Sequence, residues 1–416
     1  MNIILKAAKV IDSTSPFNNQ TVDIQIENGT ITKIANQIDN NQFEQVTYDN
    51  LHISQGWFDS SVCLGEPGFE ERENIAHGLE VAAKSGFTQI AVEPNTNPIT
   101  DSQSIVSFIK QKAFGQTTEV FPIGALTVKS EGTDLAELFD MKNAGAIAFG
   151  DYKKPIQNAN VLKIALQYVQ DFDGLVIAFS QDNSIKGKGV ANEGVESTKL
   201  GLKGIPTLAE EIQIARNLFL LEYTGGKIHF PTISTAKSVE LIKEAKQKGL
   251  NVTCSTAVHL LTMTDEKLAD FDTRYKVLPP LRNEANRQAL INGVLDGTID
   301  CITSEHNPLD IEHKKLEFNS ASYGTIGLES AFAALNTVLP TEVVIEKLTA
   351  ARNIFKIESN AITEGSKVNL TLFNPKKEYI FTKENILSKS KNSAFLNHNM
   401  NGEVYGVING DKQTLK

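Results

Sequence analysis

Short runs of consecutive apolar residues recur through the middle of the chain, separated by longer segments in which apolar residues are spaced three to four apart. The first pattern is typical of strands buried on both faces, and the second is typical of helices with one buried face. Their alternation predicts a parallel sheet with crossover helices. The eight apolar runs cover Gly56–Ser61, Phe87–Val92, Val120–Leu126, Ala146–Gly150, Leu175–Phe179, Ile228–Pro231, Val252–Thr256 and Ile299–Thr303.

Three of the segments with helical spacing have well-marked ends. They cover Asn74–Ser85, Ser238–Lys248 and Asn283–Leu295, and each is followed by a glycine suited to a helix C-terminus, namely Gly86, Gly249 and Gly297. Eight strands with intervening helices predict an α/β fold, a (β/α)8 barrel of the TIM type. In such barrels the chemistry lies at the carboxyl ends of the strands.

Both ends of the chain have a different pattern, that of β-hairpins. Near the N-terminus, Val22–Ile26 and Ile31–Ile34 flank an Asn-Gly turn, and near the C-terminus Val368–Phe373 and Val404–Ile408 read as strands. We therefore expect one small β-sandwich domain built from both chain ends. Its predicted limits are residues 1–52 and 361–416, and the barrel is predicted to cover residues 53–360.

The composition limits the classes of function. With 416 residues, 41% hydrophobic and 22% charged, the chain is long enough for one barrel-sized domain and a smaller one. A formal net charge of -10 without long basic runs argues against binding to nucleic acid or to an anionic membrane. Three scattered cysteines predict a reducing compartment, and no apolar stretch approaches the roughly 20 residues that span a bilayer. We expect a cytoplasmic protein.

Short motifs follow the predicted strands in a fixed order along nearly the whole chain. They are Glu66–Gly68, Glu93–Pro98, Asn192–Gly194, Gly201–Pro206, Ser234–Ala236, Pro279–Arg282, Asp296–Asp300, Gly327–Ser330, Glu364–Gly365 and Ser388–Ser390. Through these motifs the chain resembles dihydroorotases of the amidohydrolase superfamily more than hydantoinases or allantoinases. The resemblance implies a place in pyrimidine biosynthesis, where zinc polarises an amide carbonyl during the interconversion of carbamoyl aspartate and dihydroorotate.

The metal-binding positions that the resemblance implies are occupied by other residues. The family has two histidines after strand one, a carboxylate or modified lysine at strand four, one histidine each after strands five and six, and an aspartate after strand eight that is also the general acid and base. The corresponding residues here are Ser61, Cys63, Asp151, Phe179, Thr232 and Glu305. All four histidines are absent, and Glu305 is one methylene longer than the expected aspartate.

The substrate-binding positions have also changed. The family's arginine, which would pair with a substrate carboxylate, corresponds to Gly65, and an asparagine before the Pro-Pro-Leu-Arg segment corresponds to Leu278. The last histidine of the strand-eight motif corresponds to Leu309, whereas Asn95 is retained. One retained amide among several lost groups predicts weak recognition of a dianionic substrate.

Other titratable residues leave alternatives open. His229, His259 and His306 lie near predicted strand ends, where they form a substitute cluster or remain from an ancestral site. Cys63 is chemically a good zinc ligand, and with Asp151 and Glu305 it would form a different mononuclear site.

These residues support three hypotheses. The first is a catalytically inactive dihydroorotase homologue without a metal cofactor, a homodimer that serves as a scaffold, with aspartate transcarbamoylase as the partner that the resemblance implies. The second is an active hydrolase of cyclic amides with a rebuilt zinc site, in which Glu305 is the base, Cys63 and Asp151 are ligands and Asn95 orients the substrate. The third is a small-molecule sensor that uses the old pocket without chemistry.

Overall fold

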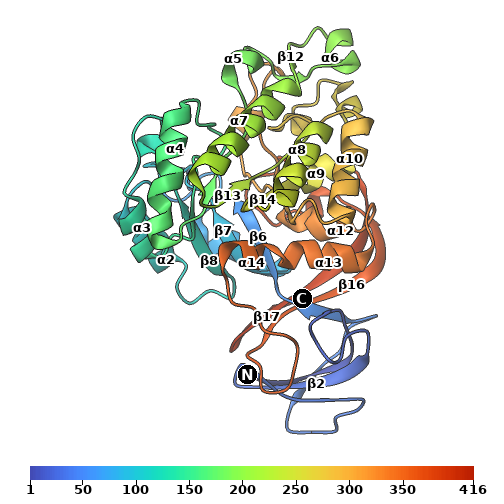
Figure 1. The fold of residues 1–416 in the computed structure, drawn as a ribbon. Coiled ribbons are helices and arrows are strands. Elements are labelled where there is room, and N and C mark those ends of the chain that lie inside the picture. The colour runs from blue at the N-terminus through green and yellow to red at the C-terminus, as the bar shows by residue number, and fades with distance from the viewer.

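Eight parallel strands form the central barrel of the chain, whose computed structural model describes residues 1–416. Neighbouring strands pair in the order in which they occur along the chain (Figure 1). Each of the eight predicted apolar runs overlaps one of them. The strands are β6 (Trp57–Val62), β7 (Phe87–Val92), β8 (Glu119–Gly124), β9 (Ala148–Phe149), β10 (Val176–Ile177), β13 (Ile228–Phe230), β14 (Val252–Ala257) and β15 (Cys301–Thr303).

The barrel closes between its first and last strands. Val62 pairs with His306 in a parallel bridge, and the backbone N–H of Cys63 donates to the carbonyl of His306 at 2.8 Å. The fully buried Asp59 adds a side-chain link, because its Oδ2 accepts from the N–H of Ser304 at 3.1 Å. These bonds bring the residues after strands one and eight into one site.

Helices cover the outside of the barrel, and several begin and end as the sequence predicts. Asn74 and Asn283 cap their helices by accepting from His77 and Asn286 N–H groups. Gly86, Gly249 and Gly297 have φ values of 97°, 79° and 80°, the left-handed conformation that ends a helix. The outer helices are α1 (Ile75–Lys84), α2 (Gln103–Lys112), α3 (Leu138–Ala144), α4 (Ala159–Tyr168), α7 (Leu208–Thr224), α8 (Ala236–Gln247), α10 (Glu284–Leu295) and α13 (Thr341–Thr349).

A long excursion between β10 and α7 covers part of the barrel mouth. It contains α5 (Asn183–Lys186), β11 (Ala191–Asn192), α6 (Val195–Lys199) and β12 (Gly204–Ile205), which lie at the top of Figure 1. The buried Arg282 fixes it, since Nη1 donates to the Asn192 side chain at 2.9 Å and to the Ile205 carbonyl at 2.8 Å. Three of the recognised motifs therefore meet in one structural network.

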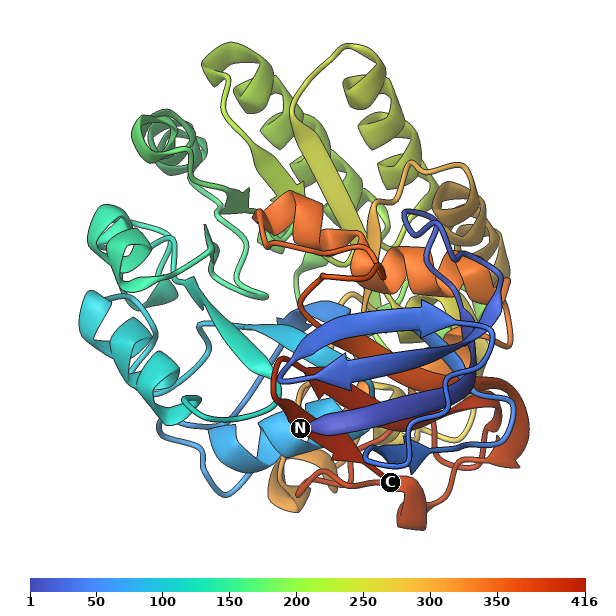
Figure 2. The same cartoon turned by 90° about the horizontal axis from the view of Figure 1, so that it is seen from below.

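Both ends of the chain form the second unit, seen from below in Figure 2. Its sheet runs in the order β18-β17-β16-β5-β1-β2-β3, with β4 paired to β1. The strands are β1 (Asn2–Val10), β2 (Thr21–Glu27), β3 (Thr30–Ala35), β4 (Glu44–Val46), β5 (His52–Gln55), β16 (Asn369–Ile380), β17 (Asn399–Asn409) and β18 (Lys412–Leu415). The predicted barrel with a small β domain is confirmed, while the domain limits stay predictions.

Aromatic packing joins the two units. The Trp57 ring of β6 lies 4.9 Å from Phe332 and 5.7 Å from Phe373, measured between ring centroids. Short helices complete the chain: α9 (Val258–Thr262), α11 (Ile311–Lys314), α12 (Ala331–Leu335) and α14 (Ala351–Phe355). None of the helices combines the length and the apolar character that crossing a bilayer requires.

Candidate functional site

A buried ion pair lies at the carboxyl ends of the barrel strands. Lys153 Nζ is 2.6 Å from Glu305 Oε2, and the two side chains are 13% and 1% exposed. Lys153 follows β9, and Glu305 follows β15. Glu305, Tyr152 and Thr232 each have a φ of 52°, a left-handed conformation that is costly for side chains of this kind and is concentrated at functional sites.

Hydroxyl groups connect the ion pair to a second buried carboxyl group. Ser61 Oγ lies 2.7 Å from Glu305 Oε1 and 2.9 Å from Glu93 Oε1, and Thr232 Oγ1 lies 3.5 Å from Glu305 Oε1. A serine hydroxyl has one hydrogen and donates to one carboxylate only. Both short contacts are satisfied when Ser61 donates to Glu305 and a protonated Glu93 donates to Ser61.

The electrostatics agree with this assignment of hydrogens. Burial and the charge of Glu305 raise the pKa of Glu93 to about 8. Burial, despite three opposing hydrogen bonds, raises the pKa of Asp59 to about 7. Of these three buried carboxyl groups, only Glu305 forms an ion pair with Lys153.

Lys153 was not predicted as a site residue. The site prediction rested on the positions that hold metal ligands in the family. Lys153 lies two residues beyond one of them, Asp151 at strand four. A lysine directly after a predicted barrel strand is the signal that would have found it, because strand ends face the site.

Asp151 and Cys63 are not arranged as ligands around Glu305. The carboxylate of Asp151 accepts from the N–H of Thr127 at 3.0 Å and from its hydroxyl, so it holds the loop after β8. Burial raises the pKa of the Cys63 thiol to about 12, whereas zinc binds the thiolate. The structure does not bring these residues together into a group that could hold a metal ion.

Phe179 and Leu278 lie in one apolar cluster. They pack with Ile205 and Ala209, and all four residues are at least 93% buried. One of the two residues stands at a predicted metal-ligand position and the other at a predicted substrate-binding position. Their contact fills this side of the barrel mouth with hydrocarbon, as expected of a close-packed interior.

The other predicted substrate positions offer few hydrogen-bond donors. A Cβ on Gly65 would lie 1.9 Å from the carbonyl oxygen of Phe69, so this backbone admits no arginine. Leu309 is buried and contributes only its N–H, which donates to Asn392 at 3.2 Å. Asn95 is partly buried, and its amide oxygen has no hydrogen-bond partner.

The histidines near strand ends do not assemble into a substitute cluster. His229 contacts the hydroxyls of Thr253 and Ser255 at 2.9 and 3.2 Å, and burial lowers its pKa to about 3. Burial also lowers the pKa of His259 to about 3, and neither of its ring nitrogens is hydrogen-bonded. No three His, Cys, Asp or Glu side chains are placed to hold a metal ion.

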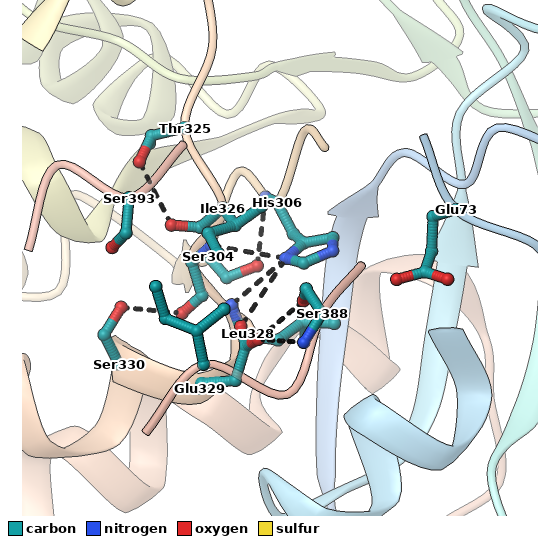
Figure 3. A network of polar contacts seen from close by, with 12 residues as sticks. Glu73, Ser304, His306, Thr325, Ile326, Leu328, Glu329, Ser330, Ser388 and Ser393 are labelled. Carbon is teal, nitrogen blue, oxygen red and sulfur yellow. Dashed lines mark hydrogen bonds and ion pairs between the residues drawn. The ribbon is translucent and has the colours of Figure 1, made fainter. Parts of the chain in front are cut away.

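His306 has a structural role in the loop after β15 (Figure 3). Its Nδ1 accepts from the N–H groups of Gly327 and Leu328 at 3.2 and 3.4 Å. The adjacent Glu329 accepts from the N–H of Ser388 at 2.9 Å and from its hydroxyl at 2.5 Å. The recognised motifs at Gly327–Ser330 and Ser388–Ser390 thus bind each other and build the frame around the strand-eight loop.

Comparison with known proteins identifies the family. A family model described as Dihydro-orotase-like matches residues 52–238. A dihydroorotase of Geotalea daltonii is 36% identical, with 99% of this chain and 98% of the relative covered. A dihydroorotase of Caldanaerobacter subterraneus subsp. tengcongensis is 38% identical over 99% of this chain and 96% of the relative. The chain belongs to the dihydroorotase family.

Structural neighbours agree with the fold of this family. An L-hydantoinase from Arthrobacter aurescens superposes with a TM-score of 0.86 at 19% identity, covering 100% of this chain and 96% of the hydantoinase. A D-hydantoinase superposes with a TM-score of 0.83 at 19% identity, covering 100% and 95%. At this identity the likeness concerns the fold, which is that of the amidohydrolase superfamily.

Lys153→Met is expected to destabilise this family member, because it leaves Glu305 buried without a cation. Breaking one partner of a buried pair typically costs about 3–5 kcal/mol. The midpoint of chemical unfolding measures the loss. The double variant Lys153→Met/Glu305→Gln removes both charges and should recover most of it; an unchanged midpoint in the single variant would show that the pair is not the electrostatic centre of the site.

Glu93→Gln tests the protonation of Glu93. A carboxyl group whose pKa is raised on folding keeps its proton in the folded state and loses it in the unfolded state. Between about pH 4.5 and about pH 8, Glu93 therefore makes stability fall as pH rises.

The amide of glutamine mimics the protonated acid. Glu93→Gln should match the wild type near pH 4.5 and exceed it above pH 8 by a few kcal/mol, at about 1.4 kcal/mol per pKa unit. Thermal unfolding across this pH range measures the difference. Equal pH profiles for the two proteins would show that Glu93 is ionised in the fold.

Proposed function

We propose that this chain is a catalytically inactive member of the dihydroorotase family and acts as a structural partner in pyrimidine biosynthesis. The observation that carries the proposal is the 2.6 Å contact between Lys153 and Glu305 inside the barrel mouth. The chemistry of the family needs a divalent ion that polarises a carbonyl and lowers the pKa of water. An ammonium group supplies positive charge but no coordination site.

A zinc ion does not fit beside Lys153. At an effective dielectric constant of about 20, two unit charges 4 Å apart interact with about 4 kcal/mol, so a divalent ion at that distance would face about 8 kcal/mol of repulsion. The residues present offer little in return, because Phe179 is apolar and burial raises the pKa of the Cys63 thiol, which makes its deprotonation costly.

The residue at the general-base position, Glu305, already has bonding partners. Glu305 is bonded to Lys153 and Ser61, with Thr232 nearby. An effective base near neutral pH has a free lone pair aimed at the proton that it removes. At two of the family's substrate-binding positions, Gly65 and Leu278 supply no side-chain donor for the carboxylates of a dianionic substrate.

Metal content and turnover test the loss of activity together. We expect near-zero zinc per chain after purification without chelator, and again after zinc loading and desalting, measured by mass spectrometry. Hydrolysis of dihydroorotate should not exceed the buffer rate, while an active dihydroorotase assayed in parallel serves as the control. Zinc at one or two per chain, with turnover that Glu305→Gln abolishes, would establish the rebuilt-site hydrolase instead.

We propose aspartate transcarbamoylase as the partner. Supporting this role, the structural motifs persist in bonded networks such as that of Glu329 and Ser388, whereas the positions that served catalysis have changed together. A protein kept for its fold and not for its chemistry is expected to act by binding.

Sedimentation of the two purified proteins from one organism tests this partner. A mixed boundary that is heavier than either protein alone is expected. The variant Lys153→Met/Glu305→Gln should form the same complex, because a scaffold does not need the buried charges. Separate boundaries at micromolar concentrations of both proteins would contradict the partnership while leaving the conclusion on activity untouched.

A further inference from the structure

A pocket of about 410 Å³ opens beside Lys153 at the barrel mouth. This volume is within the range of about 300–1,000 Å³ that is usual for small-molecule sites. Segments that follow β8, β9 and β10 build most of its wall. Of the positions that serve metal and substrate in the family, only those of Asp151 and Leu278 line it. The pocket is therefore largely built from residues to which the family motifs assign no role.

Lysines supply positive charge to this pocket. Lys153, Lys154 and Lys186 line it. Lys153 is paired with Glu305, whereas Lys154 and Lys186 form no ion pair with any acid of the chain. A lysine ammonium carries three hydrogen-bond donors and no acceptor. Two ammonium groups are thus free to bind a ligand.

Two acids also line the pocket, but neither neutralises these lysines by direct contact. The carboxylate of Asp151 is buried and accepts from the N–H and the hydroxyl of Thr127 through its two oxygens. Glu131 is exposed to solvent, where water weakens its interaction with other charges. The two free ammonium groups therefore remain the strongest binding groups of the wall.

Two further lysines lie behind one wall of the pocket. Tyr323 belongs to that wall, and Lys276 Nζ lies 4.9 Å from the centroid of its ring. Lys276 and Lys314 are 2% and 6% exposed, and their ammonium groups bond only to backbone carbonyls. Burial and the charge of Lys186 lower the pKa of Lys276 to about 8. This chain, with a net charge of -10, thus gathers lysines here without matching carboxylates, and an anion would offset their repulsion.

Amide groups add a hydrogen-bond donor beside the lysines. Gln157 Nε2 donates to the carbonyl of Gln181 at 2.9 Å, and Gln181 Nε2 donates to Asn183 Oδ1 at 3.0 Å. The amide oxygen of Asn183 is thereby occupied, while its Nδ2 group donates to no other group of the chain. All three amide residues line the pocket. The wall therefore offers donors, which suits a ligand that is rich in acceptors.

The kinds of residue in the wall indicate the class of anion. No arginine lines the pocket, and it is the planar arginine fork that matches a planar carboxylate with two parallel hydrogen bonds. Lysine binds phosphate as a point charge. Ile156, Leu278 and the ring of Tyr323 form an apolar part of the wall. A phosphate group joined to a small organic group fits both parts.

We propose that this pocket binds a small phosphate ester, with Lys154 and Lys186 as direct partners of the phosphate. Asn183 donates a further hydrogen bond, and the organic group lies against Leu278 and Tyr323. Such a site gives the sensor hypothesis a ligand class and adds a small-molecule function to the role of structural partner. It is independent of the conclusion on activity, because neither lysine stands at a metal-ligand or substrate-binding position of the family.

Calorimetric titration of the full-length protein tests the site, with inorganic phosphate and phenyl phosphate as probes at an ionic strength held constant by NaCl. We expect one phenyl phosphate per chain with a Kd below about 1 mM. Inorganic phosphate should bind more weakly because it lacks the ring, and succinate, a planar dicarboxylate, more weakly still. Lys154→Gln and Lys186→Gln should each raise the Kd about tenfold, because each removes a charge-assisted hydrogen bond.

A matched variant separates this site from general attraction of anions. Lys188→Gln removes an exposed lysine two residues beyond Lys186 that does not line the pocket, and the Kd should not change. Circular dichroism and the thermal midpoint check that every variant folds. The proposal is overturned by the absence of saturable binding, by succinate binding as tightly as phenyl phosphate, or by Lys186→Gln and Lys188→Gln having equal effects.

Discussion

The buried pair of Lys153 and Glu305 is the constraint on which the barrel mouth depends. Removing an ammonium and a carboxylate from water costs several kcal/mol for each ion, and only close geometry with further hydrogen bonds offsets that cost. Ser61 and Thr232 provide those bonds. Burial, with a contribution from the charge of Glu305, raises the pKa of the other two acids, Glu93 and Asp59. The ion pair therefore keeps Glu305 charged, while burial favours the neutral form of its two neighbours.

The barrel mouth has a polar half and an apolar half. The polar half consists of Ser61 in β6 and of residues that follow β7, β13 and β15, namely Glu93, Thr232 and Glu305. Lys153 enters this half from the loop after β9. The apolar half comes from Phe179 after strand five and from Leu278, which pack together with Ile205 and Ala209. Neither half contains a group of side chains placed to hold a metal ion. The strand order and the closure through Asp59 and Ser304 are nevertheless those of an intact barrel.

Much of the fold could be predicted from the sequence because each barrel strand is an apolar run and helix ends carry their own signals, as at Gly86 and Asn74. Strands β9 and β10 are only two residues long. An apolar run shows that a segment is buried, but it does not show over how many residues the backbone pairs. The residues at the candidate site followed from family motifs. Lys153 could not be predicted in this way, because its position does not correspond to a metal-ligand position of the family. Its long side chain reaches the site from the loop after β9.

On the proposal that this chain has lost the family's activity, Lys153 also makes a return to metal binding difficult. A histidine restored at Ser61 would remove the hydroxyl that joins Glu93 to Glu305 and would place a ring beside an ammonium that still repels metal. A histidine restored at Phe179 would insert a polar ring among Ile205, Ala209 and Leu278. On that proposal, each of these single steps disturbs the packing of the barrel mouth before a cation can bind, so a return to metal chemistry would pass through less stable intermediates.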